Sequence, residues 1–266
     1  MEACCGAAPA GSLYDAEGLK HLNLLNEAIK NTYISVTERL STLLARCEIT
    51  FDLLWALFKP NAYIYTSCPG TGKPKCVKYD FGGYKKADQN VNVFELECRY
   101  LDFDGKLLGE VTEKLAIEEF RGARRIDRME AFPLQHHSDR EEMERHFLAC
   151  GKRFVSMIGS HHCHYQGQAF FRHKNELRKL YVHSRIMIDA DGFQKSNSNY
   201  PRLRSPSNDL LLHHLCDPNY SPESNRVMSN GTKPSEMKEE DFLICCPTLL
   251  GFSLDGKFWG ETIATP

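Results

Sequence analysis

A glycine-rich string at residues 69–73 is the first candidate for chemistry in the sequence. Phosphate-binding loops wrap an anion with glycine backbone amides and reach its outer oxygens with a lysine. Gly70, Gly72 and Lys73 are the residues that such a loop would use. They are therefore the candidate nucleotide contacts of the chain.

The residues around this string weaken the match. A Walker A loop requires a glycine where Ser67 stands and a magnesium-binding serine or threonine where Pro74 stands. Such a loop also opens a helix, whereas residues 75–81 alternate like a strand. We therefore predict a turn between two strands and no bound cofactor. A nucleotide-binding enzyme that uses residues 69–73 stays as the alternative.

A histidine cluster at residues 161–164 is the second candidate, with His162, Cys163 and His164 as possible metal ligands. Adjacent side chains point in different directions, so a tetrahedral zinc site would need further ligands from elsewhere in the chain. Possible partners are His136, His137 and His173. The paired cysteine and histidine spacings of structural zinc sites are absent from the sequence. We predict a solvated histidine-rich turn without metal, and a metal-dependent enzyme is the alternative.

Further charged groups follow the predicted strands. They are the acidic pairs Glu118-Glu119 and Asp189 with Asp191, and a basic run at residues 121–125. Acids at strand ends usually form turns or are solvated, and a basic run in a nearly neutral chain is usually a solvated loop. The sequence also lacks the common nucleophile and metalloprotease motifs. We therefore expect no catalytic residues.

The composition is that of a soluble globular protein. The chain has 266 residues, 42% of them hydrophobic and 26% charged, and a formal net charge of −2. Such a charge gives no global attraction to nucleic acid or to a membrane. The eleven cysteines are an odd number in a long chain, and the N-terminus lacks the features of a signal peptide. We therefore expect an intracellular protein, cytoplasmic or nuclear, with reduced cysteines.

The first half of the chain predicts helices followed by strands. Apolar residues with helical spacing over 15–46 predict one or two amphipathic helices, whose apolar face packs on the core or forms a short coiled-coil seam. Thr50 is the expected N-cap of a short helix that is buried nearly all round and ends at Pro60. Residues 60–135 predict antiparallel strands, with a hairpin turn at Asp104-Gly105.

The second half predicts one helix among strands. A capping box at residues 138–141 predicts the start of a helix over 139–150, and Gly151 predicts its end. A proline-, serine- and asparagine-rich composition predicts a flexible insertion over 195–240. Strands are expected at 154–158, 169–171, 181–188, 242–246 and 251–254, the last followed by a turn at Asp255-Gly256.

The predicted fold class is α+β, a mostly antiparallel β-sheet domain with N-terminal helices and one internal helix. We expect a disordered leader over 1–12, a helical extension over 13–47 and one domain over 48–260.

Seven ordered strings resemble a known family. They are LWALFKPN (54–61), YLDFDG (100–105), IEEFRGA (117–123), GKRF (151–154), HYQG (164–167), RIMID (185–189) and LLGFSL (249–254). Together they are similar to the domain of unknown function that precedes the ATPase core in AAA-type ATPases of filamentous fungi.

This resemblance implies a role in partner recognition or regulation and not in catalysis. In the family the ATPase core follows the segment similar to 249–260, whereas this chain ends at Pro266. The Walker motifs, sensor and arginine finger of such a core are absent from the sequence. We expect a non-catalytic domain that binds a protein partner or a substrate of an ATPase, with no clear nucleic-acid or membrane ligand.

Overall fold

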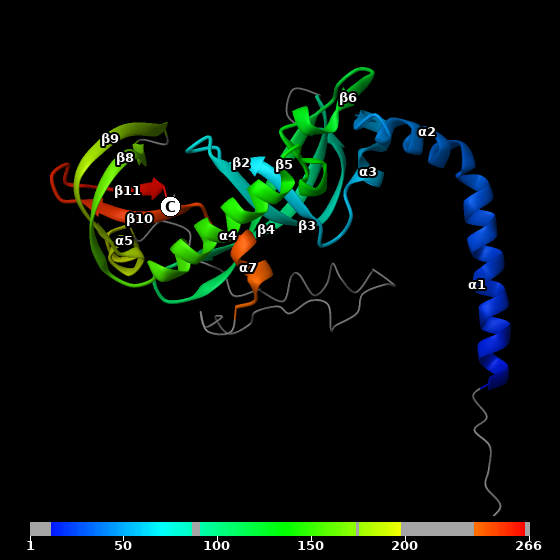
Figure 1. Cartoon of the computed structure of the whole chain (residues 1–266), viewed down its shortest axis with the longest axis horizontal. Coiled ribbons are helices and arrows are strands. Elements are labelled where there is room, and N and C mark those ends of the chain that lie inside the picture. The colour runs from blue at the N-terminus through cyan, green and yellow to red at the C-terminus, as the bar shows by residue number, and fades with distance from the viewer. Residues whose placement is uncertain (1–11, 87–90, 174–175, 198–236, 264–266) are drawn as a thin grey trace, which may run out of the picture.

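The computed structural model describes residues 12–86, 91–173, 176–197 and 237–263, and its mixture of helices and antiparallel sheets confirms the α+β class (Figure 1). The predicted leader, except Ser12, and residues 198–236 of the predicted insertion lie outside the described residues. The helices are α1 (Ser12–Thr32), α2 (Ile34–Leu44), α3 (Leu54–Leu57), α4 (Arg140–Ser156), α5 (Ala190–Ser196) and α7 (Glu239–Leu243). In the described part of the chain, no helix is both long and apolar enough to span a membrane.

Two antiparallel sheets form the body of the molecule. The five-stranded sheet has the order β5 (Leu108–Glu118), β4 (Asn92–Phe103), β3 (Pro74–Lys86), β2 (Tyr63–Ser67) and β7 (Ala131–Pro133). The second sheet closes on itself in the order β10 (Thr248–Ser253), β11 (Phe258–Ile263), β8 (His161–His173) and β9 (Glu176–Ile188). We call it the closed sheet. A short pair, β1 (Glu48–Thr50) with β6 (Ala123–Arg125), lies beside α2 and α3.

The predicted hairpin at Asp104-Gly105 is confirmed, and it joins β4 to β5. The Asp104 carboxylate accepts hydrogen bonds from the amides of Lys106 and Leu107, at 2.9 and 2.8 Å. Gly105 has a φ of +96°, which favours glycine, and a Cβ there would lie 2.4 Å from the Asp191 nitrogen. The turn therefore packs directly on the start of α5.

Both faces of the five-stranded sheet are covered, which produces two hydrophobic cores. One face packs against α2, α3 and the neighbouring loops, and Phe94 and Leu96 of β4 are fully buried there. From the other face, Cys76 and Leu101 join a core with Phe147 of α4 and with the closed sheet. Helix α4 therefore connects the two sheets, as Figure 1 shows.

Helix α4 is longer than the sequence predicts, because it continues through Gly151 to Ser156. The prediction that Gly151 ends the helix was wrong. A Cβ at this position would lie 2.0 Å from the backbone oxygen of Phe242, so the glycine permits close contact with α7. The predicted strand over 154–158 was therefore also wrong, and Phe154 is buried in the second core.

The start of α4 also differs from the prediction. Instead of forming a capping box, the Ser138 hydroxyl donates to the Asp139 carboxylate at 3.0 Å. The strand predicted over 242–246 was wrong as well, because Glu239–Leu243 form α7. After this helix the chain pairs with β4 at one point, where the Cys246 amide donates to the Leu101 oxygen at 2.8 Å. The strand predicted over 251–254 is confirmed by β10, and the predicted turn at Asp255-Gly256 joins it to β11.

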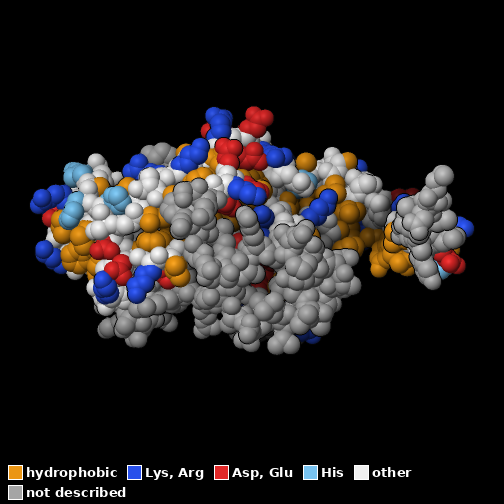
Figure 2. Space-filling view, turned by 90° about the horizontal axis from the view of Figure 1, so that it is seen from below, with side chains coloured by type: hydrophobic (Ala, Val, Ile, Leu, Met, Phe, Trp, Pro, Cys, Tyr) orange, Lys and Arg blue, Asp and Glu red, His pale blue; other side chains and the backbone are white. Residues whose placement is uncertain are grey.

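The two N-terminal helices are confirmed, but only α2 packs on a core, through Val36, Leu40, Leu43 and Leu44. Helix α1 projects away from the body (Figure 1). The described side chains of α1, residues 17–32, are all exposed to solvent, so of the two expected arrangements core packing was wrong for this helix. In space-filling view hydrophobic side chains are visible on this projecting segment, at the right (Figure 2).

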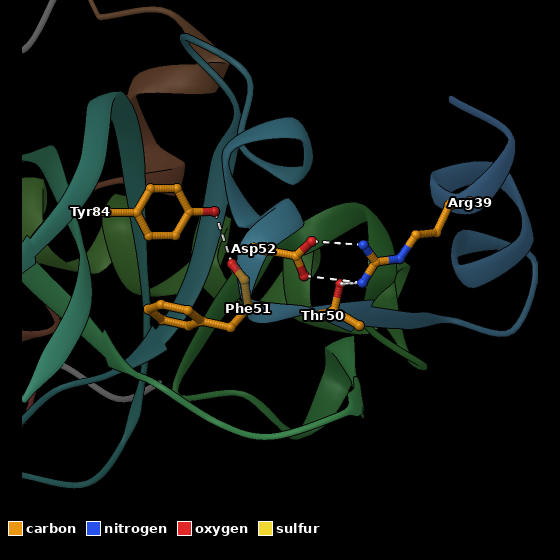
Figure 3. A network of polar contacts seen from close by, with 5 residues as sticks. All are labelled: Arg39, Thr50, Phe51, Asp52 and Tyr84. Atoms are coloured by element: carbon orange, nitrogen blue, oxygen red, sulfur yellow. Dashed lines mark hydrogen bonds and ion pairs between the residues drawn. The ribbon is translucent and has the colours of Figure 1, made fainter. Parts of the chain in front are cut away.

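Arg39 anchors α2 to the body. Its guanidinium donates to both carboxylate oxygens of Asp52, at 2.8 and 3.2 Å, and to the Thr50 hydroxyl at 3.0 Å (Figure 3). The Tyr84 hydroxyl of β3 donates to the Phe51 oxygen at 2.8 Å. Thr50 thus serves this contact instead of capping the following helix, which corrects the prediction. Trp55 of that helix is 51% exposed, so its expected burial was also wrong.

Candidate functional site

A pocket of about 270 Å³ lies where the five-stranded sheet, the end of α4 and the closed sheet meet. We call it the junction pocket. Its walls contain apolar groups, among them the rings of Tyr100, Phe103 and Phe154. Among the described residues, its ionisable groups are Lys75, Asp102, Glu113, Glu261, the Tyr100 phenol and the thiols of Cys68 and Cys246. An apolar enclosure with a few convergent polar groups is the usual form of a small-ligand site.

Lys75 of β3 is the buried cation of the pocket. Its ammonium group lies 2.6 Å from a Glu113 oxygen of β5 and 3.5 Å from the centre of the Tyr100 ring. Only 6% of the Lys75 side chain is exposed. A buried charge requires such partners because desolvation is costly. The lysine therefore reaches across β4, which lies between the two strands, to its carboxylate partner.

Asp102 of β4 is the acid with the most perturbed environment in the pocket. Burial raises the pKa of Asp102 to about 7, and the negative charges of Glu261 and Asp104 act in the same direction. The Phe103 amide, which donates to Asp102 at 2.8 Å, and the positive charge of Lys75 oppose this rise in pKa. Near neutral pH, this carboxyl group exchanges between its neutral and its charged form.

The raised pKa of Asp102 predicts a loss of stability as the pH rises. A pKa of about 7 in the folded chain, above the ordinary 3.8, means that the folded state binds the proton more tightly. The stabilisation that comes from this tighter proton binding is fully present below about pH 4. It is lost as the pH rises through 7. Asp102→Asn should therefore stabilise the protein more at pH 8 than at pH 5, by at most about 3 kcal/mol. Urea unfolding of both proteins at the two pH values measures this difference, and an equal effect at both would contradict the assignment.

Cys246 is not activated as a nucleophile. Burial raises the pKa of its thiol, and its sulfur lies 3.3 Å from the Thr248 hydroxyl oxygen. A reactive cysteine requires a lowered pKa, because the thiolate is the attacking species. The pocket therefore holds this sulfur as a neutral thiol.

Residues 69–73 form the predicted turn between β2 and β3, at the rim of the pocket. The Gly72 amide donates to the Cys68 oxygen at 2.8 Å, and the Lys73 amide donates to the Thr71 hydroxyl at 3.1 Å. Gly70 lines the pocket, whereas Lys73 is exposed. Two amides that a phosphate would need are thus engaged within the turn, and a strand follows in place of a helix.

The histidine cluster lies in strand β8, so the predicted histidine-rich turn was wrong. His162 and His164 are exposed, while Cys163 is half-buried against the second core, because successive strand residues face opposite sides. The His164 ring contacts the His183 ring edge-on at 5.1 Å. Among the described residues, no three histidine, cysteine or acidic side chains are placed to hold a metal ion.

The other proposed partners of this cluster lie elsewhere. His137 contacts the Tyr65 ring at 4.9 Å, and His136 is half-buried, with its pKa lowered by burial. Both follow β7 of the five-stranded sheet, whereas the cluster is in the closed sheet. His173 ends β8, the strand that begins with the cluster.

The remaining charged groups have structural contacts. Asp189 caps α5 by accepting the Gly192 amide at 2.9 Å, and Glu119 accepts from Asn92 at 2.8 Å. In the basic run, the Arg124 guanidinium lies 4.4 Å from the centre of the Phe120 ring. These contacts agree with the predicted structural roles of the acids. The basic run was predicted as a loop, but its residues 123–125 form β6 and pair with β1, although their side chains are exposed.

Sequence reasoning missed Lys75, Asp102 and Glu113 as a group. One signal was present, because Lys75 has the same alternation phase as Val77 and Tyr79, which are buried. A lysine on the inward side of a strand needs a buried partner. Its partner on β5 could not be identified without the register of three strands.

The match to known proteins covers only part of this pocket. No curated protein and no solved structure shows significant similarity to the chain. The matched segment runs from Arg39 in α2 to Ser138 before α4, so it contains Lys75, Asp102 and Glu113 but excludes the closed sheet. Over residues 39–138, the chain matches the family model of a domain of unknown function (DUF7025).

Proposed function

We propose that this chain is a non-catalytic recognition domain that binds a positively charged group of a protein partner in the junction pocket. The observation that carries the proposal is the excess of carboxyl groups in an enclosed pocket. Among the residues that the structure describes, Asp102, Glu113 and Glu261 line it together with one lysine, Lys75. Burial and the negative charges of Glu261 and Asp104 raise the pKa of Asp102, so a bound cation would stabilise the charged form of this carboxyl group.

The size and walls of the pocket favour a side-chain-sized ligand. Its volume of about 270 Å³ is just below the range of about 300–1,000 Å³ that is usual for small-molecule sites. Aromatic rings attract cations through their negative faces, and the Tyr100 ring already holds an ammonium group, that of Lys75. A lysine or arginine side chain has an apolar stem for the walls and a cationic head for the carboxylates.

The same charges argue against the nucleotide alternative. A phosphate placed beside the 69–73 turn would face the carboxylates of the pocket, and two amides of that turn are already engaged. The buried Cys246 thiol likewise supports a binding role over nucleophilic catalysis. One observation favours an enzyme instead, since a carboxyl group with a pKa of about 7 suits acid–base chemistry.

The seven strings similar to the fungal AAA-type ATPases extend the proposal to a cellular role. In that setting the domain would act inside the cell and hold a protein substrate or regulator for an ATPase core. Strings over 100–105 and 249–254 include or adjoin residues that line the junction pocket, namely Asp102, Phe103, Leu249 and Leu250. The resemblance and the pocket therefore involve the same part of the fold.

Binding of N-acetyl-lysine methylamide tests the proposal, with its neutral Nε-acetylated form as the matched ligand. We expect millimolar binding of the cationic form only, seen as NMR shift changes in residues around the pocket. Asp102→Asn should weaken this binding severalfold because it removes a carboxylate. Glu118→Gln changes an exposed acid on β5 outside the pocket, and should leave binding unchanged.

Two results would contradict the proposal. Equal binding of the acetylated ligand would show that the charge is not recognised. Micromolar ATP binding that is lost in Lys73→Ala would favour the nucleotide-binding alternative.

A further inference from the structure

Helix α1 exposes a row of large apolar side chains. Leu19, Leu22, Leu25 and Ile29 are 62, 58, 58 and 48% exposed, although they recur with helical spacing. The helix points away from both sheets, and the figure shows none of the described chain beside most of its length (Figure 1). This apolar row is therefore uncovered by the described part of its own chain.

A helix in this state gains little from tertiary packing. Most helical stability in proteins comes from burial of an apolar face and not from intrinsic propensity. Leaving several leucines in water also forgoes the free energy of their burial. A surface that covers the row would stabilise both the helix and the leucines.

The row has the spacing of a coiled-coil seam. Leu22, Leu25 and Ile29 are separated by three and four residues, and Gly18 lies seven residues before Leu25. At 3.6 residues per turn these four positions share one narrow stripe. Of the charged residues of α1, Glu17, Lys20, Glu27 and Lys30 lie outside that stripe, whereas Asp15, seven residues before Leu22, falls at its N-terminal end and would face the uncharged Thr32 in an antiparallel pair. Two identical helices could therefore meet along it without like charges facing each other.

We propose that the α1 helices of two copies of this chain pair antiparallel along this stripe. A two-fold axis between Asn23 and Leu24 sets Leu22 opposite Leu25 of the second copy. The same axis sets Gly18 opposite Ile29 of the second copy. The space beside Gly18 is open, with no atom within 4 Å of a Cβ built there, so it accommodates a large side chain.

Size complementarity selects the antiparallel arrangement. In a parallel pair Gly18 would face Gly18 and leave a void in the seam, which costs stability. The projection of α1 supports the same choice, because an antiparallel pair places the two bodies at opposite ends of helices about 30 Å long. The bodies then do not compete for space.

Light scattering on the full chain tests the proposal. Wild-type protein at tens of micromolar should have about twice the monomer mass of 30.4 kDa. Leu22→Glu and Leu25→Lys should each give monomers, because a charge enters the seam twice. Leu24→Glu is the matched control, because Leu24 is 63% exposed but lies about 130° around the helix from the stripe. The Leu24→Glu variant should therefore remain a dimer.

Mixing the two monomeric variants, Leu22→Glu and Leu25→Lys, tests the orientation. In an antiparallel pair, the introduced carboxylate at position 22 of one chain faces the introduced ammonium group at position 25 of the other. At the second such contact, the unchanged Leu25 and Leu22 of the two chains still face each other. A mixed dimer should therefore form. A parallel pair gives no such match, and failure of the mixture to dimerise would overturn the antiparallel arrangement. A monomeric wild-type protein, or a dimer that survives Leu22→Glu, would overturn the proposal as a whole, and a monomer would point to a different occupant of the stripe.

Discussion

Gly151→Ala should lower the free energy of unfolding by about 1–3 kcal/mol, although the same change normally stabilises a helix. An added Cβ would lie 2.0 Å from the Phe242 oxygen, so α4 and α7 would have to separate. Glycine to alanine within a helix otherwise gains up to about 1 kcal/mol from propensity. The sign of the effect therefore distinguishes a tertiary contact from local helix stability.

Urea unfolding followed by circular dichroism measures this effect. Lys152→Ala provides the control, because Lys152 is the exposed neighbour in the same helix and should change stability by less than about 0.5 kcal/mol. A Gly151→Ala protein more stable than wild type would show that α7 does not pack against α4 as described.

Lys75→Met should destabilise the protein by about 2–4 kcal/mol, because it leaves the carboxylates of the junction pocket without their buried cation. Glu113 loses its 2.6 Å ion pair, and Asp102 loses a positive charge that opposes the rise of its pKa. The Glu113 side chain is 19% exposed, so water reduces the loss below that of a fully buried pair.

A double-mutant cycle separates the ion pair from packing. Lys75→Met combined with Glu113→Gln should recover much of the lost stability, since no unpaired charge remains at that contact. Lys73→Met changes an exposed lysine in the adjacent turn and should have little effect. If the double variant is as unstable as the sum of the single variants, the two residues do not interact.

Local patterns explain the elements that the sequence predicts well. The turn at Asp104-Gly105 depends on a carboxylate that accepts neighbouring amides and on a glycine with positive φ. The helical spacing of residues 15–46 likewise identifies α1 and α2. Such features need only residues close in the chain, so they are visible without a fold.

The errors come from contacts between distant segments. Gly151 has the residue type of a helix end, but it serves the contact with Phe242. Helical spacing in α1 indicates an apolar face and does not say what covers it. The junction pocket combines β3, β4, β5, α4 and the closed sheet, so neither its shape nor the pKa of Asp102 follows from any one segment.

Calorimetric titration of N-acetyl-lysine methylamide at pH 7 is the most direct test of cation binding in the junction pocket. A cation near Asp102 should lower its pKa and release a fraction of a proton, because this carboxyl group is partly protonated at that pH. The apparent binding enthalpy of wild-type protein should then vary with the ionisation enthalpy of the buffer, and that of Asp102→Asn should not. Binding without proton release, or identical titrations of the two proteins, would contradict the account.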